Sequence, residues 1–354
     1  MAGSDVYIAA RALRLGTRHG GLTLSPVMHG LWQLEGMRNF NYTPRREETV
    51  ADMVDCVQRG LGTFELCSAY LNAQELVGDL HQELGRQLFE ESVTGVYTWA
   101  PRIDAIPGGA LTSKFVEDGI DEMLLACKVD YLDLVQLHWR PGAKDGRLVA
   151  AFRYLEDLKS KGKIRAIGAA NFGAEELELA YSEGISLATN MVALSLIDRR
   201  ALRKVAALCE QNGTKLIAYG TLLGGLMTQR FMGSFEPTMA VLDGVAQQKY
   251  WTFLQRWGPW SRFQELLFQL KHLGEKYGCS AEQVAMKWAL DQRNVGAIVV
   301  GSRFGYRNYI HDKEATLRVR LTDADTEILE YCAKLGNDLF DVFGDCGNEF
   351  RPRT

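Results

Sequence analysis

The chain has 354 residues, 47% of them hydrophobic and 24% charged, which is ordinary for a globular protein with a large core. Its formal net charge of −4 argues against a nucleic-acid partner, because binding to phosphate backbones needs a concentrated basic face. No stretch approaches the roughly 18 consecutive apolar residues of a membrane span, and seven scattered cysteines without a CxxC pair favour neither disulfides nor a metal site. We therefore expect a cytoplasmic protein with no membrane partner.

The chain begins with an expected hairpin over residues 8–25, whose turn is the segment 18–21 and which would close the floor of a barrel. Beyond it, short β-branched runs alternate with amphipathic helices. The runs predict strands near residues 26–31, 62–66, 93–98, 132–138, 164–168, 186–191, 214–219 and 296–301. Eight such strands with helical crossovers predict a parallel (β/α)8 TIM barrel, and we expect one domain over residues 1–354.

A long insertion separates the seventh and eighth expected strands. Residues 220–279 are about three times the usual connection, and they hold Trp251, Trp257, Trp260 and an apolar helix. Insertions of this kind are more typical of a loop that covers a substrate than of a linker. We expect the tryptophans to form the core of this loop after strand seven.

Several expected strands end on a residue able to carry chemistry. The second strand reaches Glu65 and is followed by Tyr70, and later strands end at Thr98, His138 and Asn171. In a barrel of parallel strands these C-terminal ends converge on one mouth, where active sites lie. Glu65 is notable because a carboxylate within an apolar strand is rarely buried without a partner.

Five stretches of the sequence resemble the aldo-keto reductase family along nearly the whole chain. They are LGTFELCSAYLNAQELVG, VDYLDLVQLHW, GKIRAIGAANF, ATNMVALSLIDRR and VVGSRFGYRN. The stretch AYGTLLGGLMTQRFMG resembles a subgroup with a long loop after strand seven. This resemblance implies a TIM barrel that transfers hydride from a nicotinamide to the carbonyl carbon of a small-molecule substrate.

The resemblance also implies roles for the strand-end residues. Tyr70 matches the acid that protonates the carbonyl oxygen, and His138 matches the histidine that orients the carbonyl. Glu65 stands where the family has an aspartate. The family lysine that makes the tyrosine proton available falls on Thr98, or on Trp99 with a slip of one residue, so this lysine is missing.

The positions that hold the cofactor in the family are matched unevenly. Asn171 matches a ligand of the nicotinamide carboxamide, whereas Met191 replaces a glutamine and offers only a weak thioether acceptor. Ser302, Arg303 and Arg307 match positions that hold the 2′-phosphate of NADP. The resemblance therefore implies NADP as cofactor, with a degraded nicotinamide seat.

Three functions remain open at this point, because function depends on the site and not on the fold. The first is NADP(H)-dependent reduction of a carbonyl on a moderately large apolar substrate, with Tyr70 as acid and His138 orienting the carbonyl. The second is a non-redox isomerase, lyase or cyclase that uses Glu65, Tyr70 and His138 as acid and base. The third is a binding protein without catalysis. We place the reductase first because the phosphate-binding positions are kept.

Overall fold

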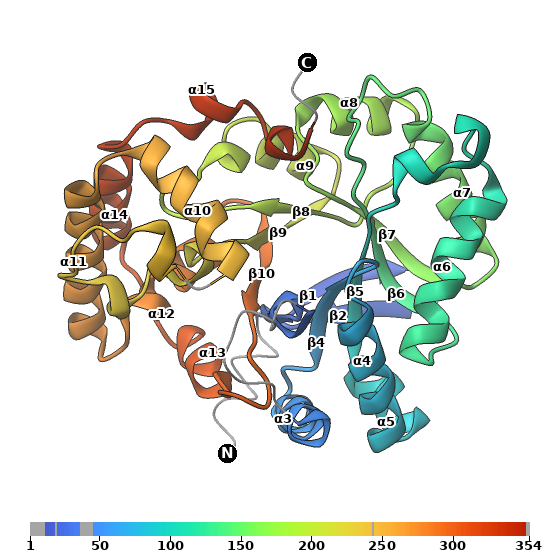
Figure 1. The fold of residues 1–354 in the computed structure, drawn as a ribbon, viewed down its shortest axis with the longest axis horizontal. Coiled ribbons are helices and arrows are strands. Elements are labelled where there is room, and N and C mark those ends of the chain that lie inside the picture. The colour runs from blue at the N-terminus through green and yellow to red at the C-terminus, as the bar shows by residue number, and fades with distance from the viewer. Residues whose placement is uncertain (1–10, 18–19, 36–44, 243, 352–354) are drawn as a thin grey trace.

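The structure of the protein is a computed structural model that describes residues 11–17, 20–35, 45–242 and 244–351. Eight parallel strands close into a barrel in the order β10-β3-β4-β5-β6-β7-β8-β9 (Figure 1). The barrel strands are β3 (Val27–Gly30), β4 (Thr63–Cys67), β5 (Thr94–Trp99), β6 (Leu132–Leu137), β7 (Ile164–Ala170), β8 (Thr189–Ala193), β9 (Lys215–Tyr219) and β10 (Val295–Gly301). The predicted barrel is confirmed, and every predicted strand overlaps an observed one.

Helices surround the barrel and pack apolar side chains against it. In α7, for example, Leu148, Phe152 and Leu155 recur at helical spacing and are fully covered. The helices are α2 (Trp32–Glu35), α3 (Arg46–Gln58), α4 (Leu71–Leu84), α5 (Arg86–Ser92), α6 (Ser113–Cys127), α7 (Leu148–Ser160), α8 (Ala174–Ser182), α9 (Val205–Gln211), α10 (Gly244–Trp257), α11 (Trp260–Tyr277), α12 (Ala281–Leu290), α13 (Ile310–Thr316), α14 (Asp323–Lys334) and α15 (Leu339–Phe343). Short 3₁₀ turns are η2 (Ile103–Ala105), η3 (Pro107–Gly109), η4 (Arg200–Leu202), η5 (Leu223–Gly225), η6 (Gln229–Phe231), η7 (Met239–Val241) and η8 (Asn348–Phe350).

The N-terminal hairpin closes one end of the barrel. Strands β1 (Leu13–Thr17) and β2 (Gly20–Leu24) pair antiparallel, which confirms the predicted hairpin. Residues 8–10 of the predicted hairpin and residues 18 and 19 of its turn lie outside the described residues. Four hairpin leucines are buried against side chains inside the barrel, namely Leu13, Leu15, Leu22 and Leu24. At the start of β5, the Thr94 hydroxyl donates to the carbonyl of Thr23 at 3.0 Å, so the hairpin plugs the N-terminal end as predicted.

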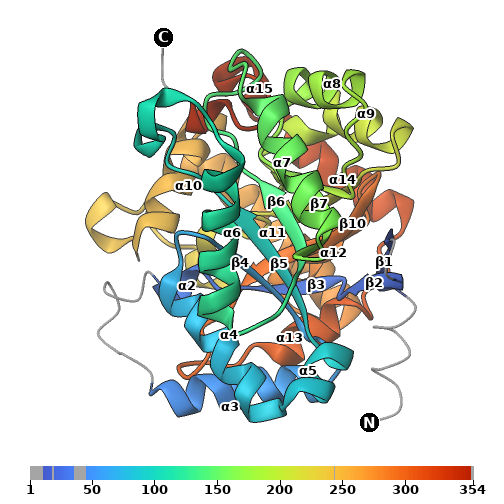
Figure 2. The same ribbon diagram turned by 90° about the vertical axis from the view of Figure 1, so that its right-hand side faces the viewer.

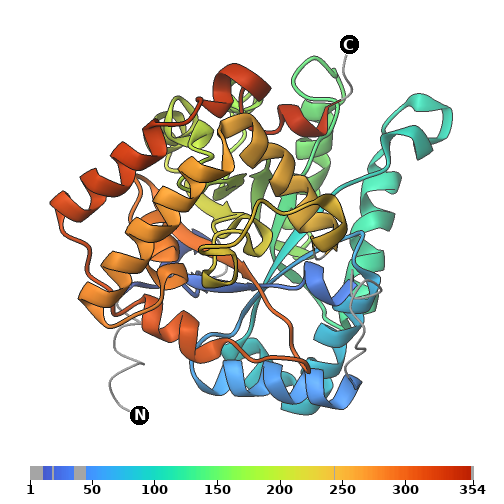
Figure 3. The same ribbon diagram turned by 60° about the vertical axis from the view of Figure 1, so that its left-hand side comes forward.

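The opposite end is covered by the insertion and by the C-terminal part of the chain. The insertion after β9 carries α10 and α11, and Figure 3 shows these gold and orange helices beside the red C-terminal segment. Phe253 of α10 stacks on Phe343 of α15 with ring centroids 4.5 Å apart. Figure 2 shows α15 at the same end of the molecule as α8 and α9, away from α3 and α5. Trp251 and Trp257 are buried, which confirms the predicted core of the loop.

Candidate active site

Strand alternation decides which side chains enter the barrel. On β4, Phe64 and Leu66 pack outward against the helices, so Glu65 between them points inward. On β5, Val96 belongs to the inner cluster, and Thr98 two residues later points the same way. Glu65 is paired in register with Val96, and Thr98 therefore lies one layer nearer the mouth on the neighbouring strand.

The side chains of Glu65 and Thr98 have no polar partner among the described residues. Glu65 is only 8% exposed and forms no ion pair there, so burial raises the pKa of its carboxyl to about 7. The Thr98 hydroxyl is buried without a hydrogen bond within the described chain. Buried polar groups are normally satisfied, and these two lie where the family has its aspartate and lysine. The inner site thus holds a carboxyl poised between its two protonation states at neutral pH.

Tyr70 lies at the rim, where the chain leaves β4 and enters α4. Its backbone N–H donates to the carbonyl of Cys67 at 2.8 Å, and the Gln74 side chain donates to the same carbonyl at 3.1 Å. The Tyr70 hydroxyl forms no hydrogen bond with any part of the chain that the structure describes. Burial, followed by the charge of Glu65, raises the pKa of Tyr70 well above its usual value. Tyr70 is therefore a protonated phenol across the physiological range.

His138 follows β6, and its backbone N–H donates to the carbonyl of Trp99 at 2.9 Å. Its ring meets the edge of Phe350 with centroids 5.1 Å apart and an interplanar angle of 78°. Burial, together with the charges of Arg140 and Lys249, lowers the pKa of His138 to about 4. The imidazole is neutral at pH 7, with one nitrogen as donor and one as acceptor.

Asn171 lies at the end of β7 with a left-handed φ of 60°, a conformation that asparagine tolerates. Its backbone N–H donates to the carbonyl of Met191 at 2.7 Å, and its Oδ1 accepts from the Tyr219 hydroxyl at 2.6 Å. The Met191 sulfur is 3.6 Å from Nε2 of buried Gln136. A Cβ at Gly347 would lie 2.0 Å from the Asn171 carbonyl oxygen, so the C-terminal segment passes this close only because it has glycine there.

The end of β10 holds the three residues expected at the 2′-phosphate. Ser302 is 3% exposed, and its hydroxyl accepts from Nζ of buried Lys313 at 2.7 Å. Arg307 is exposed at the surface and its guanidinium lies over the Tyr309 ring at 5.1 Å. A short antiparallel bridge joins Arg303 and Arg307, whose backbone N–H donates to the Arg303 carbonyl at 2.8 Å. The two arginines thus lie in one loop next to Ser302, whose hydroxyl is already hydrogen-bonded to Lys313.

Lys249 of α10 lies at the mouth, and sequence analysis missed it. Its ammonium is 4.3 Å from the ring centre of Phe350 and within 6 Å of three more rings, those of Tyr219, Tyr250 and Phe253. Burial lowers the pKa of Lys249, while Glu349 opposes this shift. Helical periodicity places a residue on a helix face but does not say which neighbour that face meets, so no sequence signal marked this lysine.

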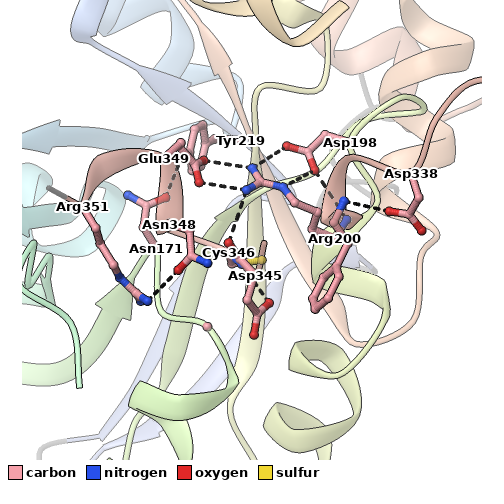
Figure 4. A network of polar contacts seen from close by, with 12 residues as sticks. Asn171, Asp198, Arg200, Tyr219, Asp338, Asp345, Cys346, Asn348, Glu349 and Arg351 are labelled. Carbon is pink, nitrogen blue, oxygen red and sulfur yellow. Dashed lines mark hydrogen bonds and ion pairs between the residues drawn. The ribbon is translucent and has the colours of Figure 1, made fainter. Parts of the chain in front are cut away.

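A buried ion cluster also lies at the mouth and holds the C-terminal segment there (Figure 4). The Arg200 side chain is 1% exposed and pairs with Asp198 and with Glu349, each at 2.8 Å. Burial alone would raise the pKa of Glu349, but the hydrogen bonds and charge of Arg200 hold it below its usual value. Asp345 adds a 2.7 Å hydrogen bond from the backbone N–H of Ala174 at the start of α8. Sequence analysis missed this cluster because its members lie far apart in the chain.

The structure therefore brings the predicted residues together in two groups. Glu65, Tyr70, Thr98, His138, Asn171 and Met191 belong to five neighbouring strands, β4 to β8, or directly follow them. Ser302, Arg303 and Arg307 follow β10, which lies between β3 and β9 on another part of the same rim. Within the described residues, no cluster of His, Cys, Asp and Glu side chains is arranged to hold a metal ion.

Comparison with known proteins identifies the family of the chain. The sequence profile of the Aldo/keto reductase family matches residues 26–334, which is most of the barrel. The chain belongs to the aldo/keto reductase family. Members of this family are NAD(P)-dependent oxidoreductases that act on small molecules, so the chain is classed as an oxidoreductase.

The individual relatives have low sequence identity to this chain, but each alignment covers most of both proteins. The chain is 26% identical to an NADH-specific methylglyoxal reductase of Escherichia coli over 88% of this chain and 96% of that protein. It resembles the structure of a glycerol dehydrogenase from Gluconobacter oxydans with a TM-score of 0.72, 19% identity and 97% coverage of both chains. An aldo/keto reductase from Klebsiella pneumoniae, solved with NADP and acetate, has a TM-score of 0.65, 18% identity, and coverage of 91% and 94%. No helix in the described ranges of this reductase-family chain is long and apolar enough to span a membrane.

Proposed function

We propose that this chain is an NADP(H)-dependent carbonyl reductase in which the Glu65 carboxyl replaces the missing lysine as the group that keeps Tyr70 supplied with protons. The observation that carries the proposal is the buried Glu65, which has no ion pair with any described residue and stands at the position matched to the family's ion-paired aspartate. A carboxyl with a pKa near the working pH suits a donor that must give and regain a proton in each cycle.

A nicotinamide nucleotide fits the residues present at two places. Arg303 and Arg307 share one loop, and the bidentate guanidinium fork of arginine suits a 2′-phosphate. At the other end, Nδ2 of Asn171 has no acceptor among the described residues, so it can donate to a carboxamide oxygen. Bound there, the nucleotide supplies the hydride. The relative from Escherichia coli is named NADH-specific, so the preference for NADP(H) rests on the two arginines.

The residues around the carbonyl then divide the work. Neutral His138 donates a hydrogen bond to the carbonyl oxygen and orients it. As negative charge develops on that oxygen, the Tyr70 hydroxyl gives up its proton, which its raised pKa has kept in place. Glu65 in its protonated form restores the proton of Tyr70, and solvent restores that of Glu65. Helix α10 and the C-terminal segment cover the mouth and keep bulk water from the carbonyl while Tyr70 gives up its proton.

The test uses the full-length protein and two measurements. NADPH fluorescence on titration shows whether the nucleotide binds, and reduction of simple aldehydes shows turnover. We expect Glu65→Gln to lower kcat roughly 10²-fold at pH 6, where the carboxyl is protonated, and to remove the fall in kcat as pH rises through 7. A Glu65→Gln enzyme with normal turnover and the same pH profile would refute the role of Glu65.

One observation favours a second candidate, a non-redox isomerase, lyase or cyclase with Glu65 as base and Tyr70 and His138 as partners. The Asn171 amide already accepts from Tyr219, and the Lys249 ammonium lies over the Tyr219 ring beside the nicotinamide seat. Absence of NADPH binding up to millimolar concentration would exclude the reductase and leave this candidate and the binding protein without catalysis. Binding without hydride transfer would favour a protein that has lost catalysis.

A further inference from the structure

Two cations lie near His138, and neither forms an ion pair within the described residues. Lys249 on α10 and Arg140, two residues after His138, are both close enough for their charges to lower the pKa of the imidazole. Neither side chain makes a hydrogen bond or an ion pair with any residue in the described ranges. Arg140 is exposed, whereas Lys249 is half-buried beneath the C-terminal segment.

The aromatic rings around Lys249 attract its ammonium without using its hydrogen-bond donors, while burial lowers its pKa. The four aromatic rings around Nζ, at 4.3 to 5.8 Å, attract a cation through their π faces. They accept no conventional hydrogen bond from the ammonium. Three N–H donors at the mouth of the barrel are therefore left for an acceptor from outside the chain.

The acidic groups near Lys249 already accept hydrogen bonds from other groups. Glu349 and Asp198 both bind Arg200, and the Asp345 carboxylate accepts from the backbone N–H groups of Ala174 and Cys346. None of these carboxylates forms an ion pair with Lys249 within the described residues. Glu65 is protonated below pH 7. The ammonium of Lys249 therefore suits an anion held next to the histidine.

We propose that Lys249 forms an anion subsite beside His138, and that the substrate is a carbonyl compound carrying a carboxylate or another oxyanion. The subsite belongs to the mouth already described, so its assignment to a carbonyl substrate rests on the proposed function. His138 contacts the carbonyl oxygen while Lys249 binds the anionic end by charge-assisted hydrogen bonds. Phe350, which touches both His138 and Lys249, packs against the body of the substrate between them.

The kinetic test compares two aldehydes of nearly equal size, 4-carboxybenzaldehyde and its neutral amide 4-carbamoylbenzaldehyde, with saturating NADPH. The wild type is expected to favour the carboxylate in kcat/KM. Lys249→Met is expected to lower kcat/KM for the carboxylate on the order of 10- to 100-fold and to change that for the amide less than about threefold. Lys249→Arg keeps the charge and should keep the preference. Lys271→Met on the neighbouring helix α11, an exposed lysine, is the matched control.

A binding measurement separates this inference from the proposed function. Calorimetry with 4-carboxybenzyl alcohol and 4-carbamoylbenzyl alcohol needs no turnover, and only the carboxylate should lose affinity in Lys249→Met. If aldehydes are reduced but the carboxylate has no advantage, the subsite is refuted and the reductase stands. If no aldehyde is reduced yet the carboxylate binds through Lys249, the reductase fails and the subsite stands. Equal binding of both alcohols to wild type and variant would overturn the subsite.

Discussion

The Tyr219 hydroxyl donates a 2.6 Å hydrogen bond to Oδ1 of Asn171, across the strand that separates β7 from β9. The same amide matches the family's ligand of the nicotinamide carboxamide. Tyr219 therefore occupies the acceptor that the carboxamide N–H₂ would use, and Met191 offers only a thioether in place of a second acceptor. Nucleotide binding at this seat has to break or share an internal hydrogen bond.

This competition predicts that Tyr219→Phe tightens NADPH binding. Removal of the hydroxyl frees Oδ1 of Asn171, and a net hydrogen bond of about 1 kcal/mol corresponds to roughly a fivefold lower Kd. Fluorescence titration measures the change. Tyr181→Phe is the matched control, because its hydroxyl donates to Thr214 at 2.8 Å and neither residue belongs to the site. Unchanged or weaker binding in Tyr219→Phe would show that the hydrogen bond does not compete with the nucleotide.

The raised pKa of Glu65 predicts a pH-dependent stability. Between its ordinary pKa of 4.5 and its folded pKa of about 7, the folded state holds a proton that the unfolded state has lost. Stability therefore falls as pH rises through this window, and the full cost of about 3 kcal/mol is present only above pH 7. Glu65→Gln removes this cost, so its stability relative to wild type should rise by up to about 3 kcal/mol between pH 4 and pH 8.

Urea unfolding at both pH values measures the difference. Glu122→Gln on α6 is the control, since this glutamate is exposed. A Glu65→Gln difference that is equal at both pH values would mean that the carboxyl has a counter-ion in solution.

Much of the fold and part of the site follow from the sequence, for a physical reason. Parallel strands bring their C-terminal ends to one rim, so Glu65, Tyr70, His138 and Asn171 could be grouped from strand positions alone. The contacts that cover the mouth of the barrel could not be predicted in this way. Lys249 faces the mouth because α10 packs on the loop after β9, where a Cβ at Gly220 would lie 2.3 Å from the Tyr250 hydroxyl.

Long-range pairing set the second limit of sequence analysis. Arg200 and Glu349 are separated by 149 positions and form one buried ion pair. In the sequence, Arg199 and Arg200 are simply two adjacent basic residues. The hydroxyl of Ser302, expected at a phosphate, proved to be bound by Lys313 from the helix that follows. Such contacts depend on which faces meet in space, and no local period encodes that.

Placing a lysine at position 98, where the family has one, tests what its absence does to catalysis. The Thr98 hydroxyl is buried and has no hydrogen-bond partner among the described residues, so Thr98→Lys breaks no hydrogen bond there and points an ammonium into the layer above Glu65. Combined with Glu65→Asp, it should raise turnover of simple aldehydes, because a cation within ~4–6 Å favours the phenolate and makes the Tyr70 proton easier to give. Thr98→Met with Glu65→Asp controls for size. If the lysine variant is no faster than the methionine variant, the charge has no role.

The arginines after β10 predict a preference between nucleotides. Only NADPH offers a 2′-phosphate to Arg307, so Arg307→Ala should weaken NADPH binding by roughly 10-fold or more and leave NADH nearly unchanged. The exposed guanidinium lies over Tyr309, and this stacking does not block its N–H donors. Titration of both nucleotides measures the ratio. Arg318→Ala, an exposed arginine beyond α13, should change neither. Equal losses of affinity for NADPH and NADH would show that Arg307 supports the structure of its loop and does not bind the 2′-phosphate. A wild type that prefers NADH would show that the residues after β10 do not bind a 2′-phosphate.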